Sequence, residues 1–273
     1  MTLRVGLIQT RTPATHAAAL AHVVPLVREA AAQGATFILT PEGTNILDRN
    51  REKLLPQLTL LADDPVVNGL RARAAELGVW IDVGSALVKR EDGKAANRQV
   101  LIDPRGEITA TYDKLHMFDV DLPTGETARE SELYEPGDRA VTAEVDGLKL
   151  GLTICYDLRF PALYRALALA GAQVMTIPAA FTRPTGAAHW EVLMRARAIE
   201  TGSYVLAAAQ GGLHEDRRGT WGHSLVVGPW GEIIGQLDHD EPGVLVADLD
   251  PAAPAKARAA IPALANARAF TGP

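Results

Sequence analysis

The chain has 273 residues, of which 47% are hydrophobic and 22% are charged, and its formal net charge is −6. This composition predicts one globular domain, residues 1–273, with a sizeable core. The acidic balance disfavours nucleic acid or an anionic membrane as a partner, because both are bound by basic faces.

Membrane and secretory segments are not expected either. No stretch approaches the ~18 apolar residues of a membrane-spanning helix, and the first residues lack the pattern of a signal peptide. The single cysteine cannot form an intramolecular disulfide, which suits a reducing compartment. We therefore expect a cytoplasmic protein.

Short apolar runs typical of buried strands alternate along the chain with Ala- and Arg-rich helical runs, which predicts an α/β fold. We expect strands at 3–9, 37–40, 79–83, 99–102, 108–112, 141–145, 148–154, 174–177, 204–209, 224–227, 233–236 and 244–248. We expect helices at 16–33, 70–77, 160–170, 189–200 and 256–260. Pro25 should lie near an end of the first helix or kink it, and Gly78 should end the second. Residues 265–273 form a tail or an arm onto a partner subunit.

Two segments, 100–108 and 226–233, share the pattern of a strand, a Pro-x-Gly turn and a returning strand. They are either unrelated hairpins with the same turn chemistry or parts of two similar α/β halves. The second interpretation predicts a four-layer αββα sandwich, in which two stacked β-sheets are flanked by helices.

Cys155 lies where a strand ends and a helix begins, which is the edge at which α/β folds bind ligands. Backbone N–H groups at such a junction can hold an oxyanion and favour a thiolate. A lone cysteine is more often a buried inert thiol, but the charged neighbours Asp157 and Arg159 favour a functional one.

A thiol needs a base or a neighbouring cation to react at neutral pH. Glu42 follows a strand within a Pro-Glu-Gly turn and suits a general base with a raised pKa. Lys114 also follows a strand, and its ammonium could stabilise an oxyanion and lower the pKa of the thiol. The alternatives without a catalytic role are that Glu42 is a turn carboxylate facing solvent and that Lys114 is a surface lysine. A Cys–His pair is the other option, with candidates His116, His189 and His223.

At these residues the sequence resembles the nitrilase superfamily of carbon–nitrogen hydrolases, whose members carry a Glu–Lys–Cys triad in this order. Three blocks carry the resemblance, which spans the chain to about Asp250: Pro41-Glu42-Gly43, Tyr112-Asp113-Lys114-Leu115-His116 and Thr153-Ile154-Cys155-Tyr156-Asp157-Leu158-Arg159-Phe160-Pro161. Further segments match the Nit branch, among them Arg129-Glu130-Ser131, His189-Trp190-Glu191 and Trp221-Gly222-His223-Ser224. The run Ala207-Ala208-Ala209-Gln210 is closer to deaminated glutathione amidases than to ω-amidases.

The resemblance implies that Glu130 is a second active-site glutamate, which positions substrate and supports the base. It implies an amidase that forms a Cys155 thioester and releases an acid and ammonia from a small carboxylate-bearing amide. Arginines are suited to carboxylate binding, and Arg183 is expected in a loop. We expect substrate contacts from Tyr156, Arg159, Phe181, Arg183, His189 and Arg129.

Metal and cofactor are not expected, because the histidines form no HExxH pattern and one cysteine cannot build a thiolate zinc site. A homodimer or higher homo-oligomer is expected from the resemblance and from the spacing of Arg195, Arg197 and Glu200.

Three rival functions stay open: an ω-amidase acting on α-ketoglutaramate or a nitrilase using the same triad, an acyltransferase, and a non-catalytic binding module. The membrane-bound transferases of the superfamily carry transmembrane helices, which this sequence lacks.

Overall fold

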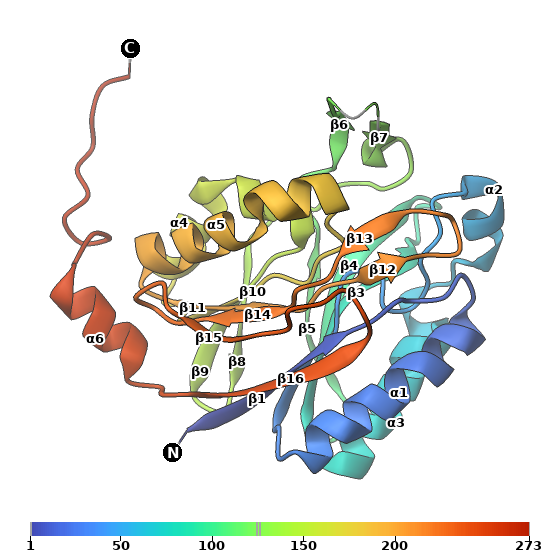
Figure 1. Cartoon of the computed structure of the whole chain (residues 1–273), viewed down its shortest axis with the longest axis horizontal. Coiled ribbons are helices and arrows are strands. Elements are labelled where there is room, and N and C mark those ends of the chain that lie inside the picture. Colours follow the sequence, from blue (N-terminus) through green and yellow to red (C-terminus); the bar gives the residue numbers. More distant parts are fainter. Residues whose placement is uncertain (1, 124, 126, 273) are drawn as a thin grey trace.

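Two large mixed sheets lie at the centre of the fold, and helices cover their outer faces (Figure 1). The computed structural model describes residues 2–123, 125 and 127–272. Within these residues the first sheet has the strand order β16-β1-β2-β3-β4-β5. Strands β1, β2 and β3 are parallel, while β16 and β4 run antiparallel to their neighbours and β5 returns antiparallel to β4. The bounds are β1 Leu3–Gln9, β2 Phe37–Leu39, β3 Trp80–Lys89, β4 Ala95–Ile102, β5 Ile108–Asp113 and β16 Gly243–Leu249.

The second sheet repeats this arrangement, with the order β15-β14-β11-β10-β9-β8. Strands β9, β10 and β11 are parallel, and the outer strands on both sides are antiparallel. The bounds are β8 Val141–Val145, β9 Leu148–Leu152, β10 Val174–Thr176, β11 Tyr204–Ala207, β14 Leu225–Val227 and β15 Ile233–Gln236. The two Pro-x-Gly hairpins therefore occupy matching places, β4–β5 and β14–β15, as the interpretation with two similar halves predicted.

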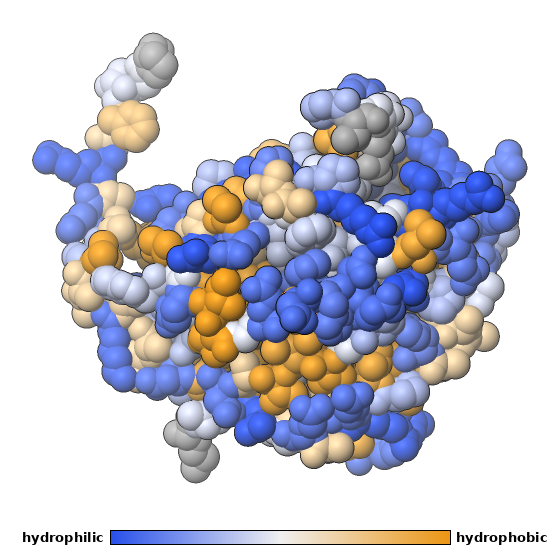
Figure 2. All heavy atoms as spheres, in the orientation of Figure 1, coloured by the Kyte–Doolittle hydropathy of each residue, from blue (hydrophilic) through white to orange (hydrophobic). Residues whose placement is uncertain are grey.

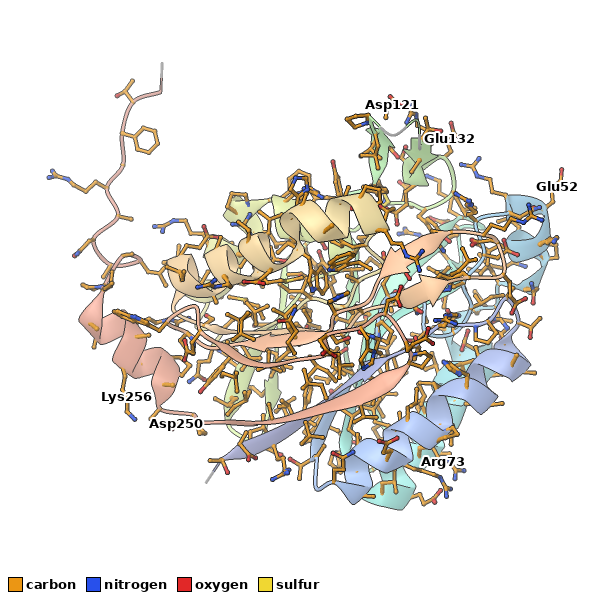
Figure 3. All side chains as sticks on the ribbon, viewed as in Figure 1. Glu52, Arg73, Asp121, Glu132, Asp250 and Lys256 are labelled. Atoms are coloured by element: carbon orange, nitrogen blue, oxygen red, sulfur yellow. The ribbon has the colours of Figure 1, made fainter. Side chains whose placement is uncertain are left out.

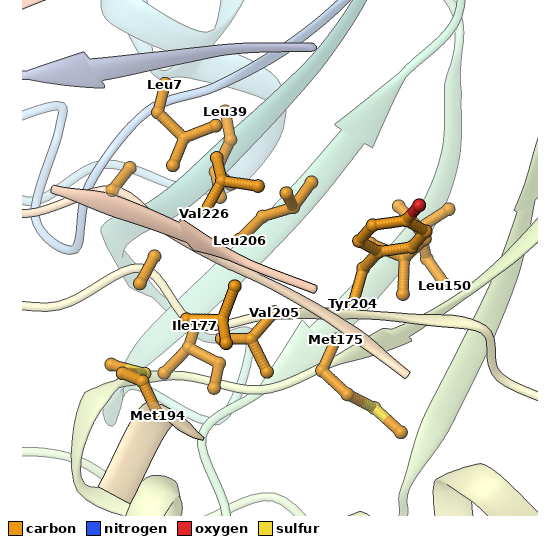
Figure 4. Close-up of a cluster of buried hydrophobic side chains, with 14 of the residues drawn as sticks. Leu7, Leu39, Leu150, Met175, Ile177, Met194, Tyr204, Val205, Leu206 and Val226 are labelled. Carbon is orange, nitrogen blue, oxygen red and sulfur yellow. The ribbon is translucent and has the colours of Figure 1, made fainter. Parts of the chain in front are cut away.

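The main core lies between the two sheets (Figure 4). In β2, Phe37 and Leu39 belong to this core, whereas Ile38 between them packs with the helices on the other face. This alternation follows from the period of two in a strand. Leu7 and Leu39 from the first sheet meet Leu206 and Val226 from the second, so the sheets are stacked face to face, as predicted.

Helices form the two outer layers. Helices α1 (His16–Ala32) and α3 (Pro65–Leu77) contact each other and β1 and β3 of the first sheet. Helices α4 (Pro161–Leu169) and α5 (Arg183–Thr201) contact β9 and β11 of the second. Helix α3 begins with Asp64, whose carboxylate accepts two backbone N–H bonds, and ends at Gly78 in the left-handed conformation. The fold is the predicted αββα sandwich.

Smaller elements occupy the rim. Helix α2 (Arg51–Leu54) and the hairpins β6–β7 (Asp119–Asp121 and Thr127–Arg129) and β12–β13 (Gly211–Leu213 and Gly219–Trp221) were not predicted. Single helical turns occupy Leu55–Gln57, Leu61–Asp63, Glu130–Glu132 and Cys155–Arg159. Helix α6 (Ala253–Ala260) precedes a C-terminal segment that extends away from the body (Figure 1). Of the predicted tail, Pro273 lies outside the described residues.

Pro25 lies in the interior of α1, which excludes the expected position near an end, while the expected alternative of a kink stays a prediction. One expectation about a helix was wrong. Helix α5 begins at Arg183, six residues before the predicted start, so Arg183 does not lie in a loop. Pro184 in the first turn explains this start, because the missing N–H of proline costs nothing there.

The outer surface in one view is largely hydrophilic, with apolar side chains gathered over β15 and β16 (Figure 2). Across the described residues, no helix combines the length and the apolar character that a bilayer crossing requires.

Candidate active site

Glu42, Lys114 and Cys155 follow β2, β5 and β9 and meet at one edge of the stacked sheets. Strand β5 runs in the same direction as β1 to β3, because two antiparallel steps separate it from β3. Its end therefore lies at the same edge as the end of β2. The three side chains are almost fully buried, with exposed fractions of 7%, 2% and 8%.

The turn that carries Glu42 is held tightly against β3. Gly84 donates its N–H to Thr40 Oγ1 at 3.1 Å, and Gly43 donates its N–H to Ser85 Oγ at 2.8 Å. A Cβ atom at Gly84 would lie 1.9 Å from the Thr40 carbonyl oxygen, so only glycine permits this approach. The backbone of the base is thereby fixed before any substrate binds.

Cys155 has a left-handed backbone conformation, with φ of +48°. Such a conformation is unfavourable for a residue with a Cβ and is found where surrounding contacts enforce it, often at functional sites. Here the Cys155 N–H donates to the Pro178 carbonyl at 2.9 Å. The backbone of Asp157 closes the turns on either side, because its N–H donates to the Ile154 carbonyl and its carbonyl accepts from Phe160. The buried Asp157 carboxylate accepts from Ile154 N, Tyr112 Oη and His116 N.

Two carboxylates, one ammonium and one amide form a hydrogen-bond network that reaches the thiol through Glu42. Lys114 Nζ lies 2.8 Å from Glu42 Oε1 and 2.9 Å from each oxygen of Glu130. Asn97 Nδ2 donates to Glu42 Oε1 at 2.9 Å and to Glu130 Oε1 at 3.3 Å. The second oxygen of Glu42 accepts the Ala180 N–H at 2.9 Å. The structure thus brings the four predicted catalytic residues together.

Burial and the neighbouring charges set the protonation states of this network. Burial, the charge of Glu42 and a hydrogen bond to it raise the pKa of Cys155 well above the usual range, and Lys114 offsets this only in part. Burial opposes ionisation of Glu42, yet Lys114 and the hydrogen bonds from Cys155 and Asn97 more than compensate and lower its pKa. Burial lowers the pKa of Lys114, but Glu130 and Glu42 outweigh it and raise that pKa. The resting site is a neutral thiol, a carboxylate and an ammonium.

The pKa of Glu42 is lowered in the folded protein, whereas the sequence led us to expect a raised pKa. The expectation considered burial alone, whereas the folded site surrounds the carboxylate with a cation and several donors. Lys114 does act on the thiol in the predicted direction, but burial and Glu42 dominate the result.

The thiol opens onto a cavity of about 300 Å³. Its lining contains three acidic residues, Glu42, Asp48 and Glu130, and six basic ones. The basic residues are Arg49, Arg51, Lys114, Arg129, Arg159 and Arg218. An excess of three positive charges in a protein of net charge −6 favours an anionic ligand.

Four of the six predicted substrate contacts line this cavity: Arg129, Tyr156, Arg159 and Phe181. The guanidinium of Arg159 lies over the rings of Tyr156 and Phe181, at 5.9 and 5.4 Å from their centroids. Arg183 and His189 are not among the lining residues.

Both of these residues have partners elsewhere. Arg183 forms an exposed ion pair with Asp240 at 2.8 Å, and His189 contacts Arg159 at 3.3 Å from outside the cavity. Their contact with substrate stays a prediction.

The Cys–His alternative gains no support from the geometry. His116 Nδ1 lies 2.7 Å from Asp157, and its ring stacks on Phe160. His223 Nδ1 lies 2.6 Å from the Trp221 carbonyl. Neither histidine lines the cavity, and the described residues contain no group of three or more His, Cys, Asp or Glu placed to hold a metal ion.

Sequence reasoning missed Asn97 and Arg218. Asn97 lies near the start of β4, which was expected to begin only at Gln99. A usable signal was present, because Asn97 and Gln99 lie two residues apart in register with the buried Leu101, which places both polar groups on the inward face of the strand. Arg218 lies in a surface turn of unremarkable sequence, and only the fold brings it to the cavity.

Comparison with known proteins agrees with this geometry. A family model described as carbon–nitrogen hydrolase matches residues 4–259. The deaminated glutathione amidase of Yersinia enterocolitica is 45% identical over 206 residues, which cover 74% of this chain and 72% of that protein. The mouse protein of the same name is 41% identical over 234 residues, covering 82% and 71%. Among solved structures, the C. elegans NitFhit protein superposes with a TM-score of 0.91 at 30% identity, covering 98% of this chain and 65% of that one.

Proposed function

The chain belongs to the carbon–nitrogen hydrolase family, and on that premise we propose that it hydrolyses a peptide-like amide with a carboxylate at each end, such as deaminated glutathione. It is an amidase, acting on C–N bonds other than peptide bonds. The observation that carries the proposal is the buried Glu42–Lys114–Cys155 network at the floor of a cationic cavity.

Acylation begins with the neutral thiol and the Glu42 carboxylate. Glu42 removes the proton of Cys155 as the sulfur attacks the amide carbonyl carbon, and the carbonyl π electrons move to the oxygen. Coupling the two events suits a thiol whose pKa is raised, because a free thiolate never needs to accumulate. The C–N bond then breaks, the nitrogen takes the proton from Glu42, and a thioester remains.

Lys114 and the N–H of Tyr156 are the donors proposed for the oxyanion. Lys114 has three protons, and one of them can be shared between the two oxygens of Glu130. A second proton serves Glu42, which leaves one to face the cavity. Glu130 then acts as the residue that holds the ammonium in this orientation.

Deacylation uses water as the nucleophile. Glu42 removes a proton from the water molecule as the water oxygen attacks the thioester carbon. The C–S bond then breaks, and Glu42 returns the proton to the sulfur. The overall reaction adds one water and yields an acid and an amine. Ammonia is the product only for a primary amide, whereas the substituted amide of deaminated glutathione releases a dipeptide.

The test is paired kinetics on deaminated glutathione and α-ketoglutaramate, followed by release of the 2-oxo acid that both share. We expect kcat/KM to be about tenfold to a hundredfold higher for deaminated glutathione, the scale of one charge-assisted hydrogen bond. Arg183→Ala is the comparison variant: it should behave like the wild type if this exposed arginine only pairs with Asp240, and a selective loss on deaminated glutathione would instead support its predicted contact with substrate. Preference for α-ketoglutaramate would make the protein an ω-amidase, and faster turnover of nitriles would make it a nitrilase.

We also propose a homodimer or higher assembly, a single domain over residues 1–273 and a cytoplasmic location. The arginine spacing that motivated the assembly has another use, because Arg197 is buried against Glu200 and the Leu158 carbonyl of its own chain. The proposed assembly is supported instead by the exposure of two apolar side chains on α5, Val192 at 68% and Ile199 at 56%. A stable 29 kDa particle in light scattering at micromolar concentration would contradict the assembly.

A further inference from the structure

Arg218 lies in the turn between β12 and β13 and is one of the residues that line the cavity. Its side chain is only 20% exposed. Its Nε atom is buried and has no hydrogen-bond partner within the ranges that the structure covers. A buried unsatisfied guanidinium donor is costly unless a ligand completes it.

The turn that presents Arg218 is rigid, and its acidic residue is already occupied. Asp216 accepts the N–H of Arg218 at 2.9 Å and the N–H of Arg49 at 3.0 Å, one with each oxygen. The Arg218 guanidinium lies 3.7 Å from Asp216, beyond hydrogen-bond distance. Both Asp216 oxygens thus bond backbone donors, and no side-chain donor of Arg218 has a hydrogen bond within the described residues.

The neighbouring histidine adds no charge beside Arg218. His214 is buried, and burial together with Arg218 lowers its pKa to about 4, so it is neutral at pH 7. The cation that this hairpin presents to the cavity is therefore Arg218.

Other arginines at the cavity are engaged with acids on the outer surface. Arg51 pairs with Glu132 at 2.8 Å, and Arg129 pairs with Asp121 at 2.7 Å. Figure 3 shows Asp121 and Glu132 at the outer end of the molecule, on the side of Glu52 in α2. Arg159 has no carboxylate partner among the described residues but stacks between two aromatic rings. Arg49 is exposed, and its guanidinium donates to the Asp216 carbonyl at 3.4 Å. Arg159 and Arg218, which come from different segments of the chain, are thus the arginines best placed to bind two separate anionic groups.

We propose that Arg218 is a specificity-determining residue that binds the carboxylate on the amine side of the scissile amide. The proposal rests on the proposed function. Glu42 must protonate the leaving nitrogen, so the amine half lies toward the wall built from the Glu42 turn. That wall continues to Arg49, whose backbone is bonded to the turn of Arg218, and the Glu42 carbonyl accepts from Gln210 just before β12. The acyl half is left to the side of Arg159.

The experiment compares Arg218→Gln with the wild type on deaminated glutathione and on its C-terminal carboxamide, in which the amine-side carboxylate is replaced by a neutral group. We expect the variant to lose about tenfold to a hundredfold in kcat/KM on deaminated glutathione. The loss on the carboxamide should be at least tenfold smaller. Equal losses on both compounds, or no loss on either, would overturn the proposal.

Arg217→Gln is the matched control, because Arg217 lies in the same turn, is exposed and does not line the cavity. It should keep wild-type kinetics on both compounds. The melting temperature of Arg218→Gln should also stay close to that of the wild type, since Asp216 retains both backbone donors.

Calorimetric binding of both compounds to Cys155→Ala separates this inference from the proposed function. A preference for the carboxylate that disappears in Cys155→Ala/Arg218→Gln supports the role of Arg218, even if the wild type hydrolyses neither compound and the proposed function fails. Absence of binding, or a preference that persists without Arg218, would overturn it.

Discussion

Replacing Asn97 with leucine tests whether hydrogen-bond donors set the reactivity of the general base. The side chain is 3% exposed and similar in size to leucine, and its Nδ2 donates to Glu42 at 2.9 Å and to Glu130 at 3.3 Å. The Oδ1 atom of Asn97 has no hydrogen-bond partner among the described residues, so its removal leaves no donor unpaired. The fold should therefore tolerate the change.

The magnitude follows from the donors that remain. Glu42 keeps Lys114 and the Ala180 N–H but loses one charge-assisted bond, worth about 1.5–3 kcal/mol. One pKa unit corresponds to about 1.4 kcal/mol, so the pKa of Glu42 should rise by about 1–2 units. Loss of a donor disfavours the carboxylate, so the acid limb of kcat/KM should move to higher pH by that amount.

The assay is kcat/KM for deaminated glutathione from pH 4 to 9, with melting temperatures measured alongside. Arg98→Gln is the control, because Arg98 is the next residue of β4 and bonds Asp113 away from the site. It should lose stability without moving the acid limb. An unchanged acid limb in Asn97→Leu would refute the assignment of that limb to Glu42 or the role of Asn97 as its donor.

Further predictions concern the nucleophile, the base and a buried carboxyl. Cys155→Ala should abolish turnover with an unchanged melting temperature, and near-wild-type activity would remove Cys155 from the mechanism. Glu42→Gln should lower kcat by at least ~10², the scale of a general base; a near-normal rate across pH would assign the base elsewhere. Burial raises the pKa of Asp82 to about 7, so wild-type stability should fall as pH rises from about 4 to about 7. Asp82→Asn should remove this fall, on the order of 4 kcal/mol at most. Denaturant unfolding at pH 5 and 8 checks it, and an identical pH dependence in both proteins would contradict it.

The sequence predicted most strands and the three central site residues because both depend on local patterns. Glu42, Lys114 and Cys155 each follow an apolar run, and the ends of parallel strands share an edge. Periodicity also located the cores of α1, α3 and α4. The start of α5 was missed because its first turn is polar and contains a proline, which the pattern treats as a loop.

Other features depend on tertiary contacts that no local pattern contains. The direction of the Glu42 pKa shift follows from Lys114, 72 residues away in sequence. Arg218 lies at the cavity in a hairpin whose Asp216 bonds the backbone of Arg49, 167 residues away in sequence. Pro25 is tolerated inside α1 because packing of a long amphipathic helix outweighs the loss of one hydrogen bond.

The two similar halves of the fold contribute different groups to the site. Strand β2 leads to Glu42, and its counterpart β10 leads to Ala180, whose backbone N–H bonds Glu42. Strand β9 leads to Cys155, and its counterpart β1 leads to Thr10, which is buried and bonded to Gln210. In each pair of matching loops, one supplies a reactive side chain and the other a hydrogen bond that holds the edge together. Neither half contains a base and a nucleophile of its own, so the chemistry depends on the register in which the two sheets are stacked.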